Sequence, residues 1–290
     1  MDEKKERLSD TDADAEMTFF EHLDALRPHL MRGIGALLLI AVVSFFFKDI
    51  IIDHILFGPR SPDFVTNRIL CRIGTALHLE GLCINQTEFS LINTRMAGQF
   101  NLHMTVSLVT AIVLSVPYLL WELWQFIKPA LTYYERRKSN RFVAYVSLCF
   151  FAGMAFGYFI IAPLTVNFLT NYLASASIQN MIDVGSYLST VIQVSLACAL
   201  VFQLPVLVYF LARMGIVSSG FMRKYRKHAI VVMAIFSAII TPPDIFSQVL
   251  VCIPLIALYE GSIRIARNVE RKKEAEEAEL YGNLPEEANS

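Results

Sequence analysis

Residues 142–164 read FVAYVSLCFFAGMAFGYFIIAPL, 23 consecutive residues without a charged side chain. A helix needs about 20 mostly apolar residues to cross the ~30 Å hydrocarbon core of a bilayer. This stretch therefore indicates a helix that spans a membrane. Gly153 and Gly157 form a GxxxG pair inside it, a pattern that favours close packing against a neighbouring helix over any direct functional role.

Further apolar runs lie on both sides of this stretch, and charged residues gather between them. Residues of the AVILMFWYC class make up 55% of the 290 residues and DEKR only 18%, whereas soluble domains carry about 25% charged residues. This composition excludes most soluble enzymes, a disulfide-rich secreted scaffold and a disordered chain. The sequence predicts an all-α, polytopic membrane protein with six transmembrane helices. The expected spans are residues 29–47, 104–121, 142–164, 187–211, 229–240 and 245–259.

Lysine and arginine residues give the expected orientation. Four precede the first span and Arg32 lies near its start, and five lie in each of the loop between spans two and three, the loop between spans four and five, and the tail. The opposite side has five, all in the first loop, so the split is 20 to 5. Because positive residues stay cytoplasmic, both termini are expected on the cytoplasmic side. The expected location is the inner membrane of the cell.

The expected organisation has three parts: residues 1–28, 29–262 and 263–290. The first is a cytoplasmic tail with an amphipathic interfacial helix, which Thr18 and Glu21 begin as a capping box and Pro28 kinks or interrupts. The second is the six-helix membrane domain, with a long first external loop at residues 48–100. The third is a charged cytoplasmic tail.

The external loop carries Cys71 and Cys83, 12 residues apart. An extracytoplasmic compartment permits oxidation, so a disulfide is one hypothesis for this pair and two free thiols are the other. Spacing alone does not establish the bond geometry.

No chemistry-bearing motif accompanies the spans. The sequence has no CxxC, HExxH, Walker A loop, GxGxxG or nucleophile elbow, and its histidines show no i, i+4 pair that would bind a metal. We therefore expect no enzyme activity, metal or cofactor. The net charge of −1 gives no general attraction to nucleic acid.

Four polar residues fall within or beside the apolar runs: Glu122, Gln203, Asp244 and Gln248. The apolar runs of spans five and six cover only roughly 18 and 22 Å, so Asp244 between them is expected below the outer surface of the bilayer. Pro242 and Pro243 end span five, which predicts a tight hairpin with span six. A lone buried glutamine is more often an interhelical hydrogen bond than a ligand, but together the four suggest one polar concave face.

Two acidic segments are candidates for a binding surface on the cytoplasmic side. Glu21, Asp24 and Arg27 occupy the polar face of the N-terminal amphipathic segment, and Glu135 precedes Arg136 between spans two and three. These charges could simply be solvated, and the N-terminal segment could simply anchor span one. Alternatively, the carboxylates receive arginine side chains, because a carboxylate and a guanidinium pair through two hydrogen bonds.

Five stretches together resemble the TatC family, the multi-spanning receptor component of the twin-arginine protein translocase. They are HLDALR (22–27), WQFIKPALTYYERR (124–137), FQLP (202–205), RKYRKH (223–228) and TPPDIFSQ (241–248). The resemblance implies a cupped arrangement of six helices that receives twin-arginine signal peptides on folded cargo, driven by the proton-motive force. It implies TatA/TatB-type single-span partners, self-association in a larger complex and contact with membrane lipid. It assigns Glu135 to the signal-peptide site and Pro59 to the external loop.

The chain departs from the family pattern at two places. Where the family usually has glutamate in its HL-x-E-LR element, this chain has Ala25, with Asp24 as the neighbouring acid. The glutamate expected before the proline of span four is Gln203 here, and Glu122 stands where the family commonly has glutamine. One hypothesis is a reciprocal exchange in which Glu122 supplies the carboxylate that Gln203 lacks; the other is independent drift.

The expected function is therefore signal-peptide reception and scaffolding without covalent chemistry. The alternative is a proton-coupled carrier of small solutes that uses Glu122 and Asp244 as its ionisable groups.

Overall fold

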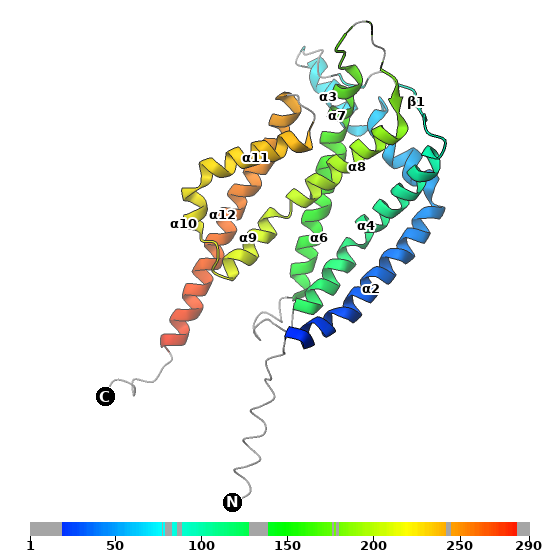
Figure 1. Cartoon of the computed structure of the whole chain (residues 1–290). Helices are drawn as coiled ribbons and strands as arrows, with labels where there is room; N and C mark the ends of the chain where they lie inside the picture. The colour runs from blue at the N-terminus through cyan, green and yellow to red at the C-terminus, as the bar shows by residue number, and fades with distance from the viewer. Residues whose placement is uncertain are drawn as a thin grey trace, which may run out of the picture.

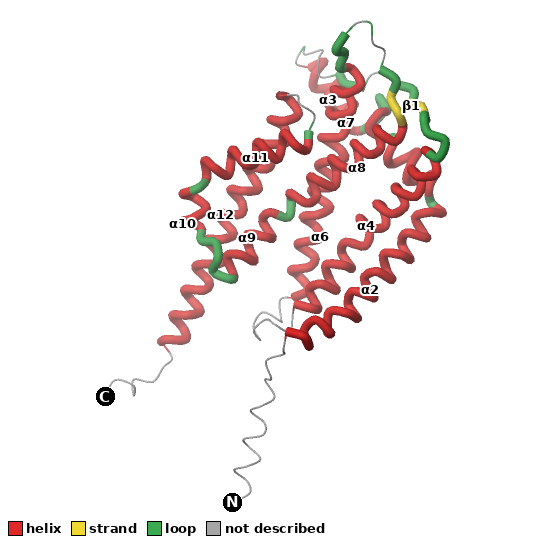
Figure 2. The backbone as a smooth tube through the Cα atoms, viewed as in Figure 1, coloured by secondary structure: helices red, strands yellow, loops and turns green. Residues whose placement is uncertain are grey.

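The computed structural model describes residues 19–76, 78, 83–85, 89–127, 139–175, 177, 180–241 and 245–282. Side chains are described for all of these except residues 19–25, 127, 139–142, 245–247 and 276–282. The described chain is helical apart from one small sheet and short connections (Figure 2). The helices are α2 (Phe19–Phe46), α3 (Val65–Ala76), α4 (Gly98–Ile127), α6 (Ser139–Phe156), α7 (Ala162–Asn171), α8 (Val184–Val201), α9 (Leu204–Arg213), α10 (Ser219–Lys224), α11 (Arg226–Ile240) and α12 (Ile245–Gly282).

Five helical segments of the described chain are long and apolar enough to cross a membrane. They are Leu26–Phe46, Gly98–Phe126, Val143–Asn171, Val184–Arg213 and Gln248–Ala275. The prediction of an all-α membrane protein is thus confirmed. The expected fifth span, residues 229–240, lies in α11, whose 15 residues rise only about 22 Å. This helix is shorter than the ~30 Å of a hydrocarbon core.

Two helices are more continuous than the sequence indicates. Pro28 lies inside α2, which continues through it as one helix. α12 contains 38 residues and continues well beyond residue 259, so it is much longer than the apolar run that predicted it. Ile263, Ala266 and Val269 are buried against α9 and α10. The expected boundary at residue 262 therefore coincides with no break in the helix.

Two expected spans contain interruptions instead. The third is α6, a π-helical turn η6 (Gly157–Ile161) and α7 in succession. The fourth is divided into α8 and α9 by a turn at Phe202 and Gln203. Pro205 explains the second break, because proline has no N–H to continue the hydrogen bonding of α8 but fits the first turn of a new helix.

The GxxxG pair lies where α6 and η6 meet α8. A Cβ atom at Gly157 would lie 2.8 Å from the Cα of Ser195, and one at Gly153 would lie 2.8 Å from the Cα of Ala199. Real side chains do not approach this closely, so the two helices touch only because both positions are glycine. The close packing predicted from the sequence is confirmed.

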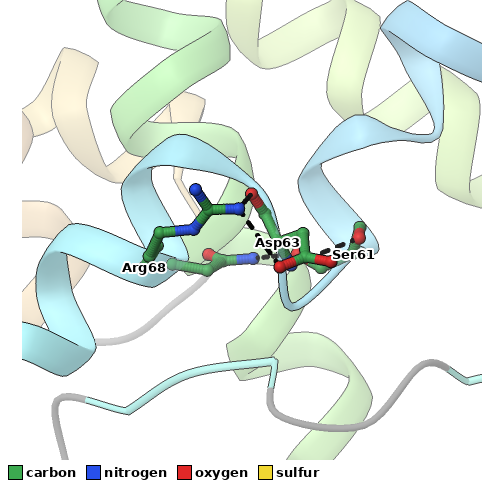
Figure 3. Close-up of polar contacts among 4 residues, drawn as sticks. Ser61, Asp63 and Arg68 are labelled. Carbon is green, nitrogen blue, oxygen red and sulfur yellow. Dashed lines mark hydrogen bonds and ion pairs between the residues drawn. The ribbon is translucent and has the colours of Figure 1, made fainter.

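A cap of short elements covers one end of the bundle. It consists of the π-helical turn η2 (Ile50–Leu56), the 3₁₀ turn η3 (Gly58–Arg60), α3 and a parallel two-stranded sheet. The strands are β1 (Leu91–Ile92) and β2 (Ile182–Asp183), which join two loops distant in sequence. Figure 3 shows the start of α3, where the guanidinium of Arg68 lies 3.1 Å from a carboxylate oxygen of Asp63 and the N–H of Asp63 donates to Ser61 Oγ.

Two buried asparagines hold the cap together. Asn67 donates from Nδ2 to the carbonyl oxygens of Pro59 and Ser61, at 3.2 and 2.8 Å. Asn85 donates from Nδ2 to the carbonyl oxygens of Pro59 and Pro163, at 3.3 and 3.1 Å. Asn85 has φ of 49°, a left-handed conformation that asparagine adopts more readily than most residues. These bonds fix Pro59, the proline of the external loop, in the interior of the cap.

Asp183 is the N-cap residue of α8 and also connects this helix to the cap of short elements. Its carboxylate accepts hydrogen bonds from the N–H groups of Gly185 and Ser186 and from the backbone and hydroxyl of Thr94. Desolvation opposes the charged form, but these hydrogen bonds outweigh it and hold the pKa of Asp183 below its usual value.

A disulfide joins Cys71 in α3 to Cys83, two residues before Asn85. Of the two hypotheses for this pair, the structure therefore contains the bonded one. Since Asn85 is fixed on α7 through Pro163 and Asn167, the disulfide closes a loop whose far end is attached to the bundle.

Replacing both Cys71 and Cys83 by serine is expected to lower the free energy of unfolding by up to about 3 kcal/mol, the chain-entropy estimate for a loop of this length. The measurement is thermal unfolding in detergent with and without a reductant. The parent protein should lose stability when reduced, whereas the double variant should not respond. A Cys149→Ser variant, altered at a free cysteine, is the control and should keep the full response. Two titratable thiols at positions 71 and 83 in oxidised membranes would contradict the prediction.

Candidate functional site

The start of α2 lies beside the end of α4. The two helices run in opposite directions and pack side by side along their lengths (Figure 1). Both the first turn of α2 and the last turn of α4 therefore lie at the end of the bundle opposite the cap. The first turns of α2, which contain Glu21 and Asp24, therefore lie beside the last turn of α4, which residues 128–138 follow in the sequence.

Glu122 marks the contact between these two helix ends. Its side chain is only 5% exposed although it lies in an apolar span. One carboxylate oxygen lies 2.5 Å from Nδ1 of His29 in α2, and the other accepts a hydrogen bond of 2.7 Å from the hydroxyl of Tyr118, one turn earlier in α4. Both oxygens of the buried carboxylate are thus satisfied.

An apolar crevice of about 230 Å³ lies directly beside this contact. His29 and Glu122 are the polar groups in its wall, and the remaining lining is apolar. Gly33 allows the helices to come together here, because a Cβ atom at this position would lie 3.0 Å from Cδ2 of Leu119. The crevice and the polar contact form one feature of the interface between α2 and α4.

The predicted signal-peptide residues are partly beyond the described side chains. Arg27 is exposed on α2. Glu21 and Asp24 lie in the first turns of α2, where only the backbone is described, and Glu135 and Arg136 lie outside the described residues. The assignment of these residues to one binding site stays a prediction.

The polar residues expected on one concave face have separate partners. Gln203 donates from Nε2 to the carbonyl oxygen of Val146 at 3.3 Å, across α6. Gln248 donates from Nε2 to the carbonyl oxygen of Ala234 at 3.4 Å, and its backbone carbonyl oxygen accepts from the hydroxyl of Ser237. Gln248 thus holds α11 and α12 together. Asp244 lies outside the described residues.

The hypothesis of an exchange between Glu122 and Gln203 receives no support from these contacts. Glu122 takes His29 and Tyr118 as partners, and Gln203 takes a backbone carbonyl of α6. The Oε1 atom of Gln203 is buried and has no hydrogen-bond partner among the described residues. Two glutamines thus act as interhelical hydrogen-bond donors, which is the commoner use of such residues in membrane spans.

Sequence reasoning missed His29 and Tyr118. A charged residue inside an apolar span requires a partner, so Glu122 was itself the available signal. The i, i+4 spacing points to Tyr118, but His29 lies 93 residues away and only the fold brings it close. No three His, Cys, Asp or Glu side chains converge as metal ligands anywhere in the described part of the chain.

Comparison with known proteins agrees with this architecture. The family model "TatC: Sec-independent protein translocase protein (TatC)" matches residues 21–254. A protein named Sec-independent protein translocase protein TatC from Blattabacterium sp. subsp. Periplaneta americana is 36% identical over 260 residues, covering 89% of this chain and 98% of its own. One of the same name from Desulforapulum autotrophicum is 36% identical over 269 residues, covering 91% and 90%. A crystal structure entitled Twin Arginine Translocase Receptor-TatC superposes with a TM-score of 0.61 at 28% identity, covering 86% of this chain and all of that one.

Proposed function

Because the chain belongs to the TatC family of Sec-independent protein translocase components, we propose that it is the receptor for twin-arginine signal peptides of folded cargo proteins. In this role it binds the signal peptide and scaffolds the translocase, and the proton-motive force drives export. The groups that bind the arginines are the carboxylates of Glu21, Asp24 and Glu135. Arg27 and Arg136 belong to the same proposed surface.

The contact between His29 and Glu122 is the observation that supports this proposal. It fixes the start of α2 against the last turns of α4, from which the two acidic segments extend. A receptor for two adjacent arginines needs carboxylates on both sides of the guanidinium pair. Charge-assisted, two-pronged hydrogen bonds between guanidinium and carboxylate then select arginine over lysine.

The family and the charge pattern also support a cellular arrangement. We infer a multi-pass protein of the inner membrane with both termini cytoplasmic, in which α11 acts as a short sixth span beside α12. The proposed partners are single-span TatA/TatB-type proteins, further copies of this chain in a larger complex, and membrane lipid. The 20-to-5 distribution of basic residues supports the orientation.

Site-specific photo-crosslinking tests the proposal. A photoreactive residue at position 134, beside Glu135, and another at Leu26 are expected to capture a signal peptide with two arginines and to capture poorly the same peptide with two lysines. A third at Met96, a fully exposed residue near the cap, is the control and should capture neither. Equal capture of both peptides at position 134 would contradict the proposal.

A flux measurement separates the receptor from a carrier. Liposomes that contain only this protein are expected to show no saturable, proton-coupled solute uptake. Saturable uptake that Glu122→Gln abolishes would favour the carrier and contradict the receptor.

A further inference from the structure

The polar clamp, defined as His29, Tyr118 and Glu122, is more than the packing of two apolar helices requires. Moving a carboxylate into an apolar span costs free energy, and that cost is offset only by well-placed partners. A well-packed apolar residue at position 122 would avoid the cost altogether. The clamp therefore provides something that apolar packing does not.

We infer that the clamp fixes the rotation of α2 about its own axis relative to α4. Apolar surfaces in lipid attract each other through packing alone, and neighbouring registers of two smooth helices differ little in free energy. The outward side chains of α2 are apolar over several turns, including Leu30, Ile34 and Leu38. A buried hydrogen-bonded pair has one geometry, and a polar group inside an apolar interface is known to fix register in this way. His29 and Glu122, at 2.5 Å, can meet only at one rotation of α2.

That rotation determines where the N-terminal acidic residues point. One helical position changes the direction of a side chain by about 100° and its height by about 1.5 Å. Glu21 and Asp24 lie within about two turns of His29 on the same continuous helix. The rotation of α2 at His29 therefore sets the direction of both carboxylates relative to the end of α4.

Among the described side chains, one arginine also acts on the clamp. Arg32 lies one turn after His29 on α2 and interacts electrostatically with Glu122. The wall of the adjacent crevice adds only apolar side chains from both helices. The contact between His29 and Glu122 thus joins α2 to the final turns of α4 through polar groups.

We propose that His29 and Tyr118 are positioning residues, which hold Glu122 and thereby set the rotation of α2 for binding the arginine pair. This inference rests on the proposed function of the acidic segments. Neither residue touches the signal peptide. Their effect reaches it through the direction of Glu21 and Asp24.

Replacing Glu122 by glutamine should preserve the clamp. The amide oxygen can accept from the hydroxyl of Tyr118, and the amide nitrogen can donate to Nδ1 of a neutral His29. Glu122→Ala and His29→Ala remove the bridge altogether. Tyr118→Phe removes one hydrogen bond and keeps the ring, so it is the milder variant.

The first measurement is the affinity of the purified, full-length protein for a twin-arginine signal peptide. Glu122→Ala and His29→Ala are expected to weaken binding at least tenfold, Tyr118→Phe less, and Glu122→Gln no more than threefold. The matched control is Arg226→Ala, which breaks the 2.8 Å ion pair with Glu260 between α11 and α12. It should leave the affinity unchanged.

The second measurement reports the position of α2 without any peptide. Spin labels at Arg27 and Leu123, both exposed, give the distance distribution between α2 and α4 when Cys149, Cys198 and Cys252 are replaced by alanine. The distribution should be narrow in the parent and in Glu122→Gln, and broad or shifted in Glu122→Ala. Where Glu122→Ala does not fold, Tyr118→Phe takes its place in both measurements.

The outcomes separate the two proposals. If the parent protein does not prefer arginine over lysine peptides, the proposed function fails while the distance measurement still tests the clamp. If Glu122→Ala has the same peptide affinity and the same distance distribution as the parent, the proposed role of the clamp is overturned. A loss in Glu122→Gln as large as in Glu122→Ala also overturns it, because it would show that the charge and not the bridge matters.

Discussion

Replacing Gly157 by valine is expected to reduce the yield of folded protein in the membrane at least tenfold. A Cβ atom at this position would lie 2.8 Å from the Cα of Ser195, 2.9 Å from the Cβ of Cys198 and 3.1 Å from the carbonyl oxygen of Val194. Two of these three atoms belong to the backbone of α8, so no side chain can rotate away to make room. The helices must separate instead.

The expected cost is about 3 kcal/mol, the upper end of the range for an overpacked interior. This is a large part of the 5–15 kcal/mol by which domains are commonly stable. Gly153→Val should behave in the same way, because its Cβ would lie 2.7 Å from the carbonyl oxygen of Cys198. The measurement is the amount of monodisperse protein after extraction, together with its thermal unfolding in detergent.

Gly35→Val is the matched control. Gly35 is also a helix-interior glycine in a span, but nothing lies within 4 Å of the position its Cβ would take. Gly35→Val and Gly153→Val each replace a glycine inside an α-helix, so they change helix propensity similarly and differ in packing. A similar loss of folded protein in the Gly35 variant would attribute the effect to propensity and contradict the prediction.

Replacing Glu135 by alanine is expected to weaken binding of a twin-arginine signal peptide about tenfold to a hundredfold. Hydrogen bonds to charged groups contribute about 1.5–3 kcal/mol, and each 1.4 kcal/mol is a factor of ten in affinity. A peptide with two lysines should lose much less, since an ammonium group cannot form the two-pronged pair. The measurement is the dissociation constant of each peptide on the purified protein in detergent.

Two further variants complete this comparison. Glu260→Ala removes a carboxylate that pairs with Arg226 far along the chain, and it should not change the ratio of the two affinities. Glu21→Ala and Asp24→Ala, measured separately, determine which acidic residue of α2 takes the role of the glutamate that the family usually has at the position of Ala25. An equal loss for arginine and lysine peptides in Glu135→Ala would contradict the pairing between carboxylate and guanidinium.

The helical class and most of the spans were predictable because the bilayer imposes one rule on the backbone. Every N–H and C=O group in hydrocarbon must be satisfied internally, so a long apolar run can only be a helix. The same reasoning predicts the close contact at Gly153 and Gly157, since in lipid small residues are the main means by which helices approach. The lengths of helices at polar ends were less predictable: α12 has 38 residues and continues past its apolar run, where Ile263, Ala266 and Val269 pack against α9 and α10.

The resemblance read from the sequence assigned the family correctly, and the family comparison agrees over residues 21–254. The candidate site was predictable only as separate segments. The sequence places Glu122 in an apolar span but cannot pair it with His29, because periodicity reports the face of one helix and not the helix opposite. The exchange with Gln203 stays a hypothesis that the sequence suggests by chemistry alone; in the structure Glu122 contacts His29, and Gln203 donates to the carbonyl oxygen of Val146.

The sequence by itself determined that the chain is a helical membrane protein, where most of its spans lie and which glycines allow two of them to touch. These properties depend on the solvent around each segment and on the size of single side chains, both of which are local. The tertiary structure alone decided that α2 packs antiparallel to α4, that β1 pairs with β2, and that His29 meets Glu122. Such pairings depend on the relative free energies of whole helix arrangements, to which residues far apart in the chain contribute together.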